Sequence, residues 1–223
     1  MFKMNSVDFN NKVALKNLDK LSDKQVFQEW LQRLRDYYIT PAEEMNKIQN
    51  GLASMILQMC AIDAASSFLS DATHTKDKIK SFCFDMLKSS IDYQLKQAEE
   101  IGYGDKITLS EDEIDSITSH LYYQYRCGLV HNGFTLQFGQ YSSKNDTEHI
   151  FLISYETNDP VLTTYLDSGK KGFIVNPIKF KTMIQYEFSK VQKADVEKRE
   201  AIGKNIKNSL SLQIQIAKEF RDQ

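Results

Sequence analysis

The chain has 223 residues, of which 41% are hydrophobic and 26% are charged, so it is long enough to bury a sizeable core. Its net charge of −2 predicts no global attraction to nucleic acids or membranes, so any such binding needs a local patch. Its three cysteines are too few for a disulfide framework, and its polar N-terminal stretch contains no apolar run typical of a signal peptide. We therefore expect a cytoplasmic protein with reduced thiols.

The N-terminal part predicts an arm followed by a helix. Residues 1–21 are polar and weakly patterned, so we expect a loose N-terminal arm. A helix is predicted to begin at Ser22, because Ser22 and Gln25 have the spacing of a capping box. Apolar residues then recur at helical period up to Leu34, and Pro41 is expected to end or restart this helix.

The next helical pattern is the strongest in the chain. Apolar residues keep one face of a helix over residues 45–62, which is about five turns. Residues 52–69 form the most apolar stretch, but Gln58 and Asp63 interrupt it. We therefore predict a buried helix here and not a membrane span.

Two further helices are predicted before residue 134. The third covers residues 76–100. The fourth starts near Ser110, which has capping-box spacing to Glu113, and it should stop at Gly133. Its predicted core face consists of Ile114, Ile117, Leu121 and Tyr125.

After Gly133 the apolar pattern changes from the helical period to alternation. Alternating, β-branched and aromatic segments predict strands at 134–138, 150–155, 161–166 and 173–175. Residues 167–172 have the composition of a hairpin turn, so we expect a small antiparallel sheet. A fifth helix is predicted from Pro177 and a sixth over residues 196–220.

Together these patterns predict a mainly α fold of the α+β type. The expected organisation is a helical bundle over residues 22–133, a small antiparallel sheet over 134–176 packed on it, and C-terminal helices of the same domain over 177–223.

The end of the fourth predicted helix carries the residues that indicate chemistry. Arg126 and His131 are five residues apart, which on a helix is about 7–8 Å of rise and about 140° of rotation. Two copies of the helix meeting at a two-fold axis would bring two Arg and two His side chains around one cleft. Histidine exchanges a proton near neutral pH, and arginine binds phosphate oxygens through its planar fork. The pair therefore suits phosphodiester cleavage without a metal, and Tyr122, one turn earlier, could stack on a base or orient a phosphate.

Two other interpretations of this region stay open. Arg126 and His131 could be surface side chains that favourably meet the negative end of the helix dipole. His120, Cys127 and His131 share one helical face, so a dimer could instead hold zinc, although no Cys-x-x-Cys motif supports a metal site.

Charge is concentrated in the C-terminal part. Residues 170–207 contain ten Lys or Arg against four Asp or Glu. This stretch could follow an RNA backbone, or it could be the solvated face of two amphipathic helices.

Arginine followed after four residues by histidine, near the end of a long helix in a bundle, resembles the signature of the HEPN superfamily. The resemblance covers about residues 43–133 well and the remainder loosely. It implies a HEPN-like bundle that forms a homodimer with its two motifs facing each other. It also implies a metal-independent endoribonuclease without cofactor, often a toxin or an antiviral defence effector with an antitoxin or defence-system partner.

Residue by residue, the resemblance makes Arg126 the phosphate-binding arginine and His131 the catalytic histidine. Tyr122 and Asn132, which lie close to this pair in the sequence, are predicted to bind the substrate. The expected product is a 2′,3′-cyclic phosphate. The position directly after the arginine, where the family often has a polar residue such as Asn, is Cys127 here. The alternative is therefore a non-catalytic HEPN-like module that binds RNA, a nucleotide or a protein partner.

Overall fold

A computed structural model of the chain describes residues 17, 20–70, 73–101, 110–123, 150–157, 160–165 and 171–221. The backbone divides into two compact units. The first combines Met1–Tyr37 with Phe188–Gln223, and the second is Tyr38–Glu187. The predicted arm over residues 1–21 lies mostly outside the described residues, and the predicted domain boundaries stay a prediction.

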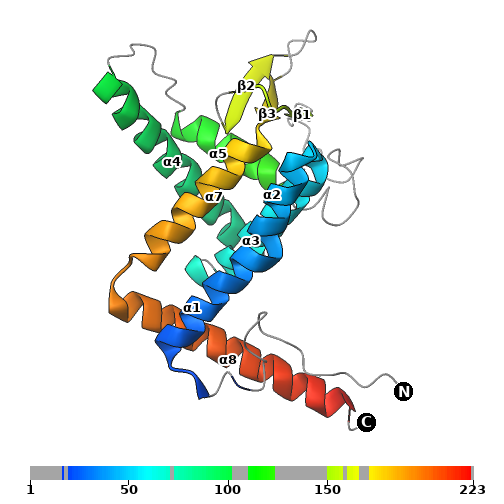
Figure 1. The fold of residues 1–223 in the computed structure, drawn as a ribbon, viewed down its shortest axis with the longest axis vertical. Helices are drawn as coiled ribbons and strands as arrows, with labels where there is room; N and C mark the ends of the chain where they lie inside the picture. Colours follow the sequence, from blue (N-terminus) through cyan, green and yellow to red (C-terminus); the bar gives the residue numbers. More distant parts are fainter. Residues whose placement is uncertain are drawn as a thin grey trace. The chain divides into compact units, whose positions relative to one another are not determined.

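In the first unit, helix α1 (Asp23–Leu34) packs against helix α8 (Val196–Arg221), as Figure 1 shows. A Cβ atom at Gly203 would lie 1.9 Å from the carbonyl oxygen of Asp23, so a glycine is needed where α8 passes the start of α1. The Lys207 ammonium donates to the Leu21 carbonyl at 2.8 Å. Among the described side chains of the two helices, the buried apolar ones are Val26, Phe27, Trp30, Leu31, Leu34, Ile202 and Ile206.

The predicted start of α1 is confirmed. The Ser22 N–H donates to Gln25 Oε1 at 2.8 Å, and the Gln25 N–H donates to Ser22 Oγ at 3.3 Å. This reciprocal capping box satisfies two of the N–H groups that a helix start leaves without a partner in the helix.

The predicted restart of the helix at Pro41 is confirmed, because Pro41 lies in the first turn of a new helix. After Leu34 the chain forms a π-helical turn, η2 (Arg35–Ile39), and then helix α2 (Thr40–Lys47). Proline has no N–H to donate, and its ring crowds the carbonyl four residues earlier, here that of Tyr37. A wider turn before Pro41 relieves this conflict locally.

The prediction of one uninterrupted helix over residues 45–62 is wrong. Helix α2 ends at Lys47, and helix α3 (Gly51–Leu69) begins after a turn in which Gln49 has a φ of 55°. Asn50 caps α3 by accepting the Ala53 N–H at 3.1 Å. Because the break rotates the chain, Ile48 is 67% exposed and does not belong to the buried face.

Helix α3 has apolar residues on all sides, yet some of its buried side chains are polar. Gln58 is fully buried, and its Nε2 donates to Ser54 Oγ at 2.7 Å and to the Pro177 carbonyl at 3.0 Å. Of the helices in the described ranges, α3 alone has the length and hydropathy to suit a membrane span, but a core helix passes the same test. Its buried glutamine and serines bonded within the protein are the features of a core helix.

The predicted starts of the remaining helices of the second unit are confirmed, whereas the predicted end of the fourth helix at Gly133 lies outside the described residues. Helix α4 (Thr75–Ile101) packs against α3 and against α5 (Glu111–His120). Helix α7 (Pro177–Gln192) begins in this unit and buries Phe180 and Ile184, as expected. The C-terminal helices α7 and α8 therefore confirm the predicted fifth and sixth helices.

The small sheet is mixed, so the prediction of a wholly antiparallel sheet is wrong. Its strands are β1 (Ile150–Ile153), β2 (Val161–Tyr165) and β3 (Lys171–Val175), in the order β1-β3-β2. Strands β2 and β3 pair antiparallel, as expected of a hairpin, whereas β1 pairs parallel with β3. Alternation specifies which face of a strand is buried but not which strand lies beside it. The predicted strand at 134–138 lies outside the described residues.

The sheet packs on the helices of the second unit. Gly51 opens α3 so close to β1 that a Cβ atom there would lie 2.5 Å from Ile153 Cγ2. Phe173 in β3 is 2% exposed, and its ring centroid lies 5.4 Å from that of His120 in α5. The mainly helical prediction with a small added sheet is therefore confirmed in this coarse form.

Candidate active site at the end of α5

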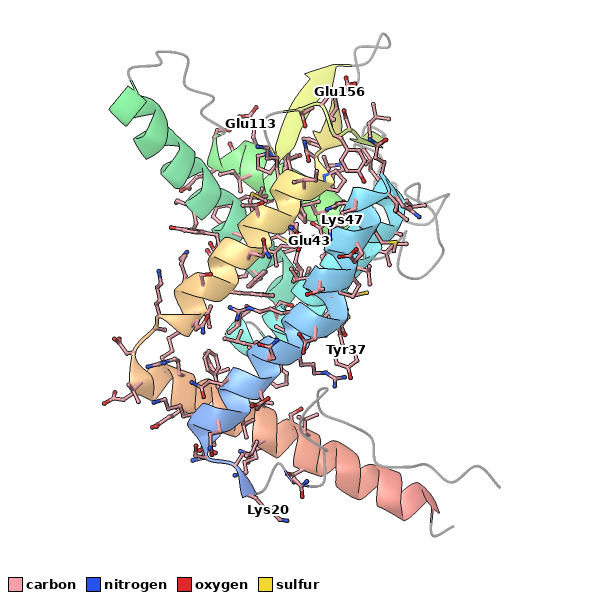
Figure 2. The ribbon with its side chains drawn as sticks, viewed as in Figure 1. Lys20, Tyr37, Glu43, Lys47, Glu113 and Glu156 are labelled. Atoms are coloured by element: carbon pink, nitrogen blue, oxygen red, sulfur yellow. The ribbon has the colours of Figure 1, made fainter. Side chains whose placement is uncertain are left out.

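Helix α5 is the element that leads into the predicted Arg126–His131 motif. Its start has the predicted capping box: the Ser110 N–H donates to Glu113 Oε2 at 2.9 Å, and the Glu113 N–H donates to Ser110 Oγ at 3.3 Å. Figure 2 labels Glu113 at this helix start. The predicted core face is confirmed for Ile114, Ile117 and Leu121, while Tyr125 lies outside the described residues.

The helix changes geometry just before the motif. Residues 121–123 continue α5 as a π-helical turn. Leu121 is fully buried, whereas Tyr122 and Tyr123 are half-buried. The two tyrosine rings meet edge to face, with centroids 5.2 Å apart and an interplanar angle of 80°. Such single π turns are frequent at functional sites, because they redirect side chains that an α-helix would point elsewhere.

Helix α4 supplies charged partners along α5. Lys88 lies 2.6 Å from Glu111, and Lys80 lies 3.7 Å from Asp115. The Lys88 hydrogen bond and charge lower the pKa of the Glu111 carboxyl. The lysine that comes earlier in α4 pairs with the residue that comes later in α5, so the two helices run antiparallel.

A third lysine of α4, Lys76, contacts the aromatic ring of Tyr123. Lys76, near the start of α4, is exposed, and its Nζ lies 4.9 Å from the centroid of Tyr123. This is cation–π geometry. The antiparallel pairing thus places a positive charge and two aromatic rings at the end of α5 from which the chain enters the motif.

Tyr122 is the one predicted site residue that lies within the described residues. Arg126, His131 and Asn132 lie in the range 124–149, outside the described residues, and so does Cys127. Their roles stay predictions. Sequence analysis did not identify Lys76 and Tyr123. The adjacent tyrosines before Arg126 were visible in the sequence, but the approach of Lys76 depends on how α4 and α5 align.

Of the predicted zinc ligands, only His120 is within the described residues. Its Nδ1 lies 2.6 Å from the Ser116 carbonyl oxygen, one turn earlier, so Nδ1 is the protonated nitrogen that donates. In the described part of the chain, no three His, Cys, Asp or Glu side chains are grouped as metal ligands.

The basic C-terminal stretch has two kinds of lysine. Lys181 is 9% exposed with its Nζ 3.4 Å from Glu43 Oε1, and Lys207 bonds the Leu21 carbonyl, so both serve the fold. Other basic residues are exposed in solvent: Lys179, Lys190, Lys193, Lys198 and Lys204.

Comparison with known proteins adds no relative: no family model, no curated protein and no solved structure matches this chain.

Proposed function

We propose that this protein is a metal-independent endoribonuclease of HEPN type that acts as a homodimer in the cytoplasm. The observation that carries the proposal is the Arg126–His131 spacing directly after a capped helix of the bundle. The buried Ile117 and Leu121 support it, because they give the helix a fixed base next to the motif.

The proposed chemistry is an internal transfer at phosphorus. His131 takes the proton of a ribose 2′-hydroxyl, and the 2′-oxygen attacks the adjacent phosphorus. The bond from phosphorus to the 5′-oxygen of the next nucleotide breaks, and that oxygen takes up a proton from the partner's histidine or water. Arg126 stabilises the charge on the phosphate oxygens. The products are a 2′,3′-cyclic phosphate and a 5′-hydroxyl end.

The biological setting follows from the same resemblance. We propose RNA as the substrate, a toxin or antiviral defence role, and an antitoxin or defence-system protein as the partner. A nuclease active on the RNA of its own cell requires such control.

The test is RNA cleavage in EDTA by the purified full chain. Arg126→Ala and His131→Ala should each reduce the cleavage rate about 100- to 10,000-fold, because each removes one of the two groups the reaction needs. His74→Ala is the matched control, since His74 is exposed and lies outside the motif. Cleavage that survives both motif variants, or that needs a divalent metal, contradicts the proposal.

The second candidate is a non-catalytic module that binds RNA, a nucleotide or a protein partner. Cys127 favours this second candidate, because the family that the chain resembles often has a polar residue at this position. Intact RNA at high protein concentration, with binding retained, identifies this module. Cleavage gained by Cys127→Asn would assign the difference to that one position.

A further inference from the structure

We infer that the C-terminal part of helix α8, residues 208–221, binds the same part of α8 in a second copy of this chain, with Leu212 at the contact. This self-association surface is additional to the proposed motif cleft, and it does not depend on nuclease activity.

Helix α8 extends well beyond its packing with α1. It spans Val196–Arg221, which is 26 residues or about 39 Å. Lys207, whose ammonium donates to the Leu21 carbonyl at 2.8 Å, lies where α8 crosses the start of α1. Residues 208–221 add about 21 Å of helix beyond this crossing. Figure 1 shows this part as the red end of α8, which continues past α1.

This part of α8 needs a packing partner. A helix of so few turns is marginal in water, because helical stability in proteins comes mostly from the packing of an apolar face. Residues 208–217 contain no charged side chain, so no ion pairs between successive turns support the helix here. Leu212 is nevertheless 58% exposed, so much of this apolar side chain is left in water.

Leu212 lies on the side of α8 that faces away from α1. At 100° per residue, position 212 is about 180° around the helix from Gly203, which contacts the start of α1. Asn205, about 20° from position 212 on the same side, is exposed as well. The next residues at a spacing of four are Ile216 and Phe220, so an apolar row continues along this side to the end of the helix.

A second copy of the chain suits this face because a two-fold contact places each group against its own kind. A charged face would repel its copy, whereas residues 208–217 have no charge. The polar residues in this stretch are Asn, Ser and Gln, whose side chains both donate and accept hydrogen bonds and so can pair with identical side chains.

The same composition does not suit RNA or a membrane surface. An RNA backbone is bound mainly through Lys and Arg, and a helix that lies on a membrane has such residues along its polar face. Residues 208–217 contain neither. The occupant that fits an uncharged face with an apolar row is therefore another α8.

The experiment measures self-association of the full chain by sedimentation over a range of concentrations. Leu212→Lys removes an apolar contact and adds like charges on both copies, so the dissociation constant should rise at least about tenfold. Leu212→Met keeps a similar apolar volume and should stay within about threefold of wild type.

Two controls separate this contact from a general effect of the substitution. Ile48 is also an exposed apolar residue, at 67%, but lies in the second unit, so Ile48→Lys should leave the dissociation constant unchanged. Because Leu212 is exposed in the single chain, Leu212→Lys should unfold at the same urea concentration as wild type when both are diluted to monomers.

Several results overturn the inference. They are a wild-type chain that stays monomeric, an unchanged dissociation constant for Leu212→Lys, and an equal increase for Ile48→Lys. A less stable Leu212→Lys monomer would show that another part of the same chain covers this face. Vesicles of phosphatidylcholine and phosphatidylglycerol that bind wild type but not Leu212→Lys would assign the face to a membrane.

Failure of this contact is distinguishable from failure of the proposed nuclease. If RNA is cleaved through Arg126 and His131 while Leu212→Lys associates as wild type, the α8 contact is wrong and the nuclease stands. If Leu212→Lys weakens association of a chain that leaves RNA intact, the nuclease is wrong and the α8 contact stands.

Discussion

Gly203 is a residue where packing overrides helix propensity. A Cβ atom there would lie 1.9 Å from the Asp23 carbonyl oxygen, which is backbone and cannot rotate away. Gly203→Ala should therefore reduce the free energy of unfolding by at least about 1 kcal/mol, because the clash exceeds the gain in helix propensity. Urea denaturation followed by circular dichroism measures this.

The matched control for Gly203→Ala is the reverse change two residues earlier. Ala201 is exposed in the same helix, so Ala201→Gly reports propensity alone and should cost about 1 kcal/mol. Stabilisation by Gly203→Ala would mean that α8 does not approach Asp23 so closely.

Cys60 and Cys83 differ in burial and should differ in reactivity. Burial raises the pKa of the Cys83 thiol to about 12, whereas Cys60 is half-exposed. Because the thiolate is the reactive form, Cys83 should be alkylated by iodoacetamide at pH 8 at least about tenfold more slowly than Cys60. Mass spectrometry of the two peptides gives both rates, and in concentrated urea they should become similar.

The same burial gives the sign of a pH effect. The folded state keeps the Cys83 thiol neutral, whereas the unfolded chain ionises it near its ordinary value of 9.0. The stability that depends on the neutral thiol is thus fully present below pH 9 and is lost as the pH rises toward about 12. Cys83→Ala should show a shallower loss of stability over this alkaline range, and an equal slope in both proteins would contradict the assignment.

At the scale of elements, Asn176 links the sheet to α7. Its Oδ1 accepts the N–H groups of Ile178 and Lys179 at 3.0 and 3.2 Å, which caps the helix. Its Nδ2 donates to the carbonyls of Tyr155 and Thr157 at 3.1 and 2.7 Å, which holds the segment after β1. One buried side chain thus satisfies a helix start and fixes a connection of the sheet.

Asn176→Ala should therefore cost more than removal of an ordinary helix cap. We expect a loss of about 2–4 kcal/mol, because four hydrogen-bonding groups lose their partner. Asn50→Ala is the matched control: Asn50 is exposed, caps α3 through one bond to Ala53, and should cost about 1 kcal/mol. Equal losses in urea denaturation would show that the bonds to Tyr155 and Thr157 add nothing.

Local signals in the sequence predicted helix starts well but connections poorly. Ser22 and Ser110 were identified as capping residues because their partners lie three positions away, within reach of local reasoning. The break at residues 48–50 was missed, because the apolar period of α2 continues into α3 although Asn50 and Gly51 favour a turn. The parallel pairing of β1 with β3 was missed because no local pattern specifies strand order.

The sequence predicted the part of the candidate site that lies on one helix, and it did not predict the contact between two helices. Tyr122, Arg126 and His131 were chosen from spacing along a single helix. Lys76 lies 47 positions before Tyr123 in the sequence, so its contact depends on the alignment of two helices that no short motif encodes. The contact between Lys76 and Tyr123 therefore needed the structure, whereas the proposed catalytic pair came from the sequence.

At the scale of the whole molecule, the chain groups its elements by packing and not by order. Helices α1 and α8 come from opposite ends of the chain yet share one unit, and Gly203 and Lys207 both contact residues at the start of α1. Contacts between such distant segments close a long loop, and the entropic cost of this closure must be offset by the packing between the two helices. Sequence patterns identified both helices but contained no signal that they belong together.

The proposed nuclease activity depends on the dimer, since two chains are needed to complete one cleft. Its specific activity should therefore fall when the protein is diluted below the dissociation constant of the dimer. Analytical ultracentrifugation over the same concentrations measures the dimer independently. Specific activity that stays constant while the dimer dissociates would show that one chain suffices.

Mixed dimers test whether the cleft is shared. Wild-type chain is refolded with an equal amount of the double variant Arg126→Ala/His131→Ala, so that about a quarter of the particles are wild-type dimers. We compare the mixture with the same total amount of wild-type chain refolded alone. If the cleft requires both motifs, the mixture should retain about a quarter of that activity. If each chain has an independent site, the mixture should retain about half. A refolded mixture with Lys80→Ala as second chain controls for losses in handling, because Lys80 faces Asp115 and lies outside the proposed motif. Retention of half the activity would leave an RNA-cleaving protein but remove the shared cleft, because each chain would then carry its own complete set of groups.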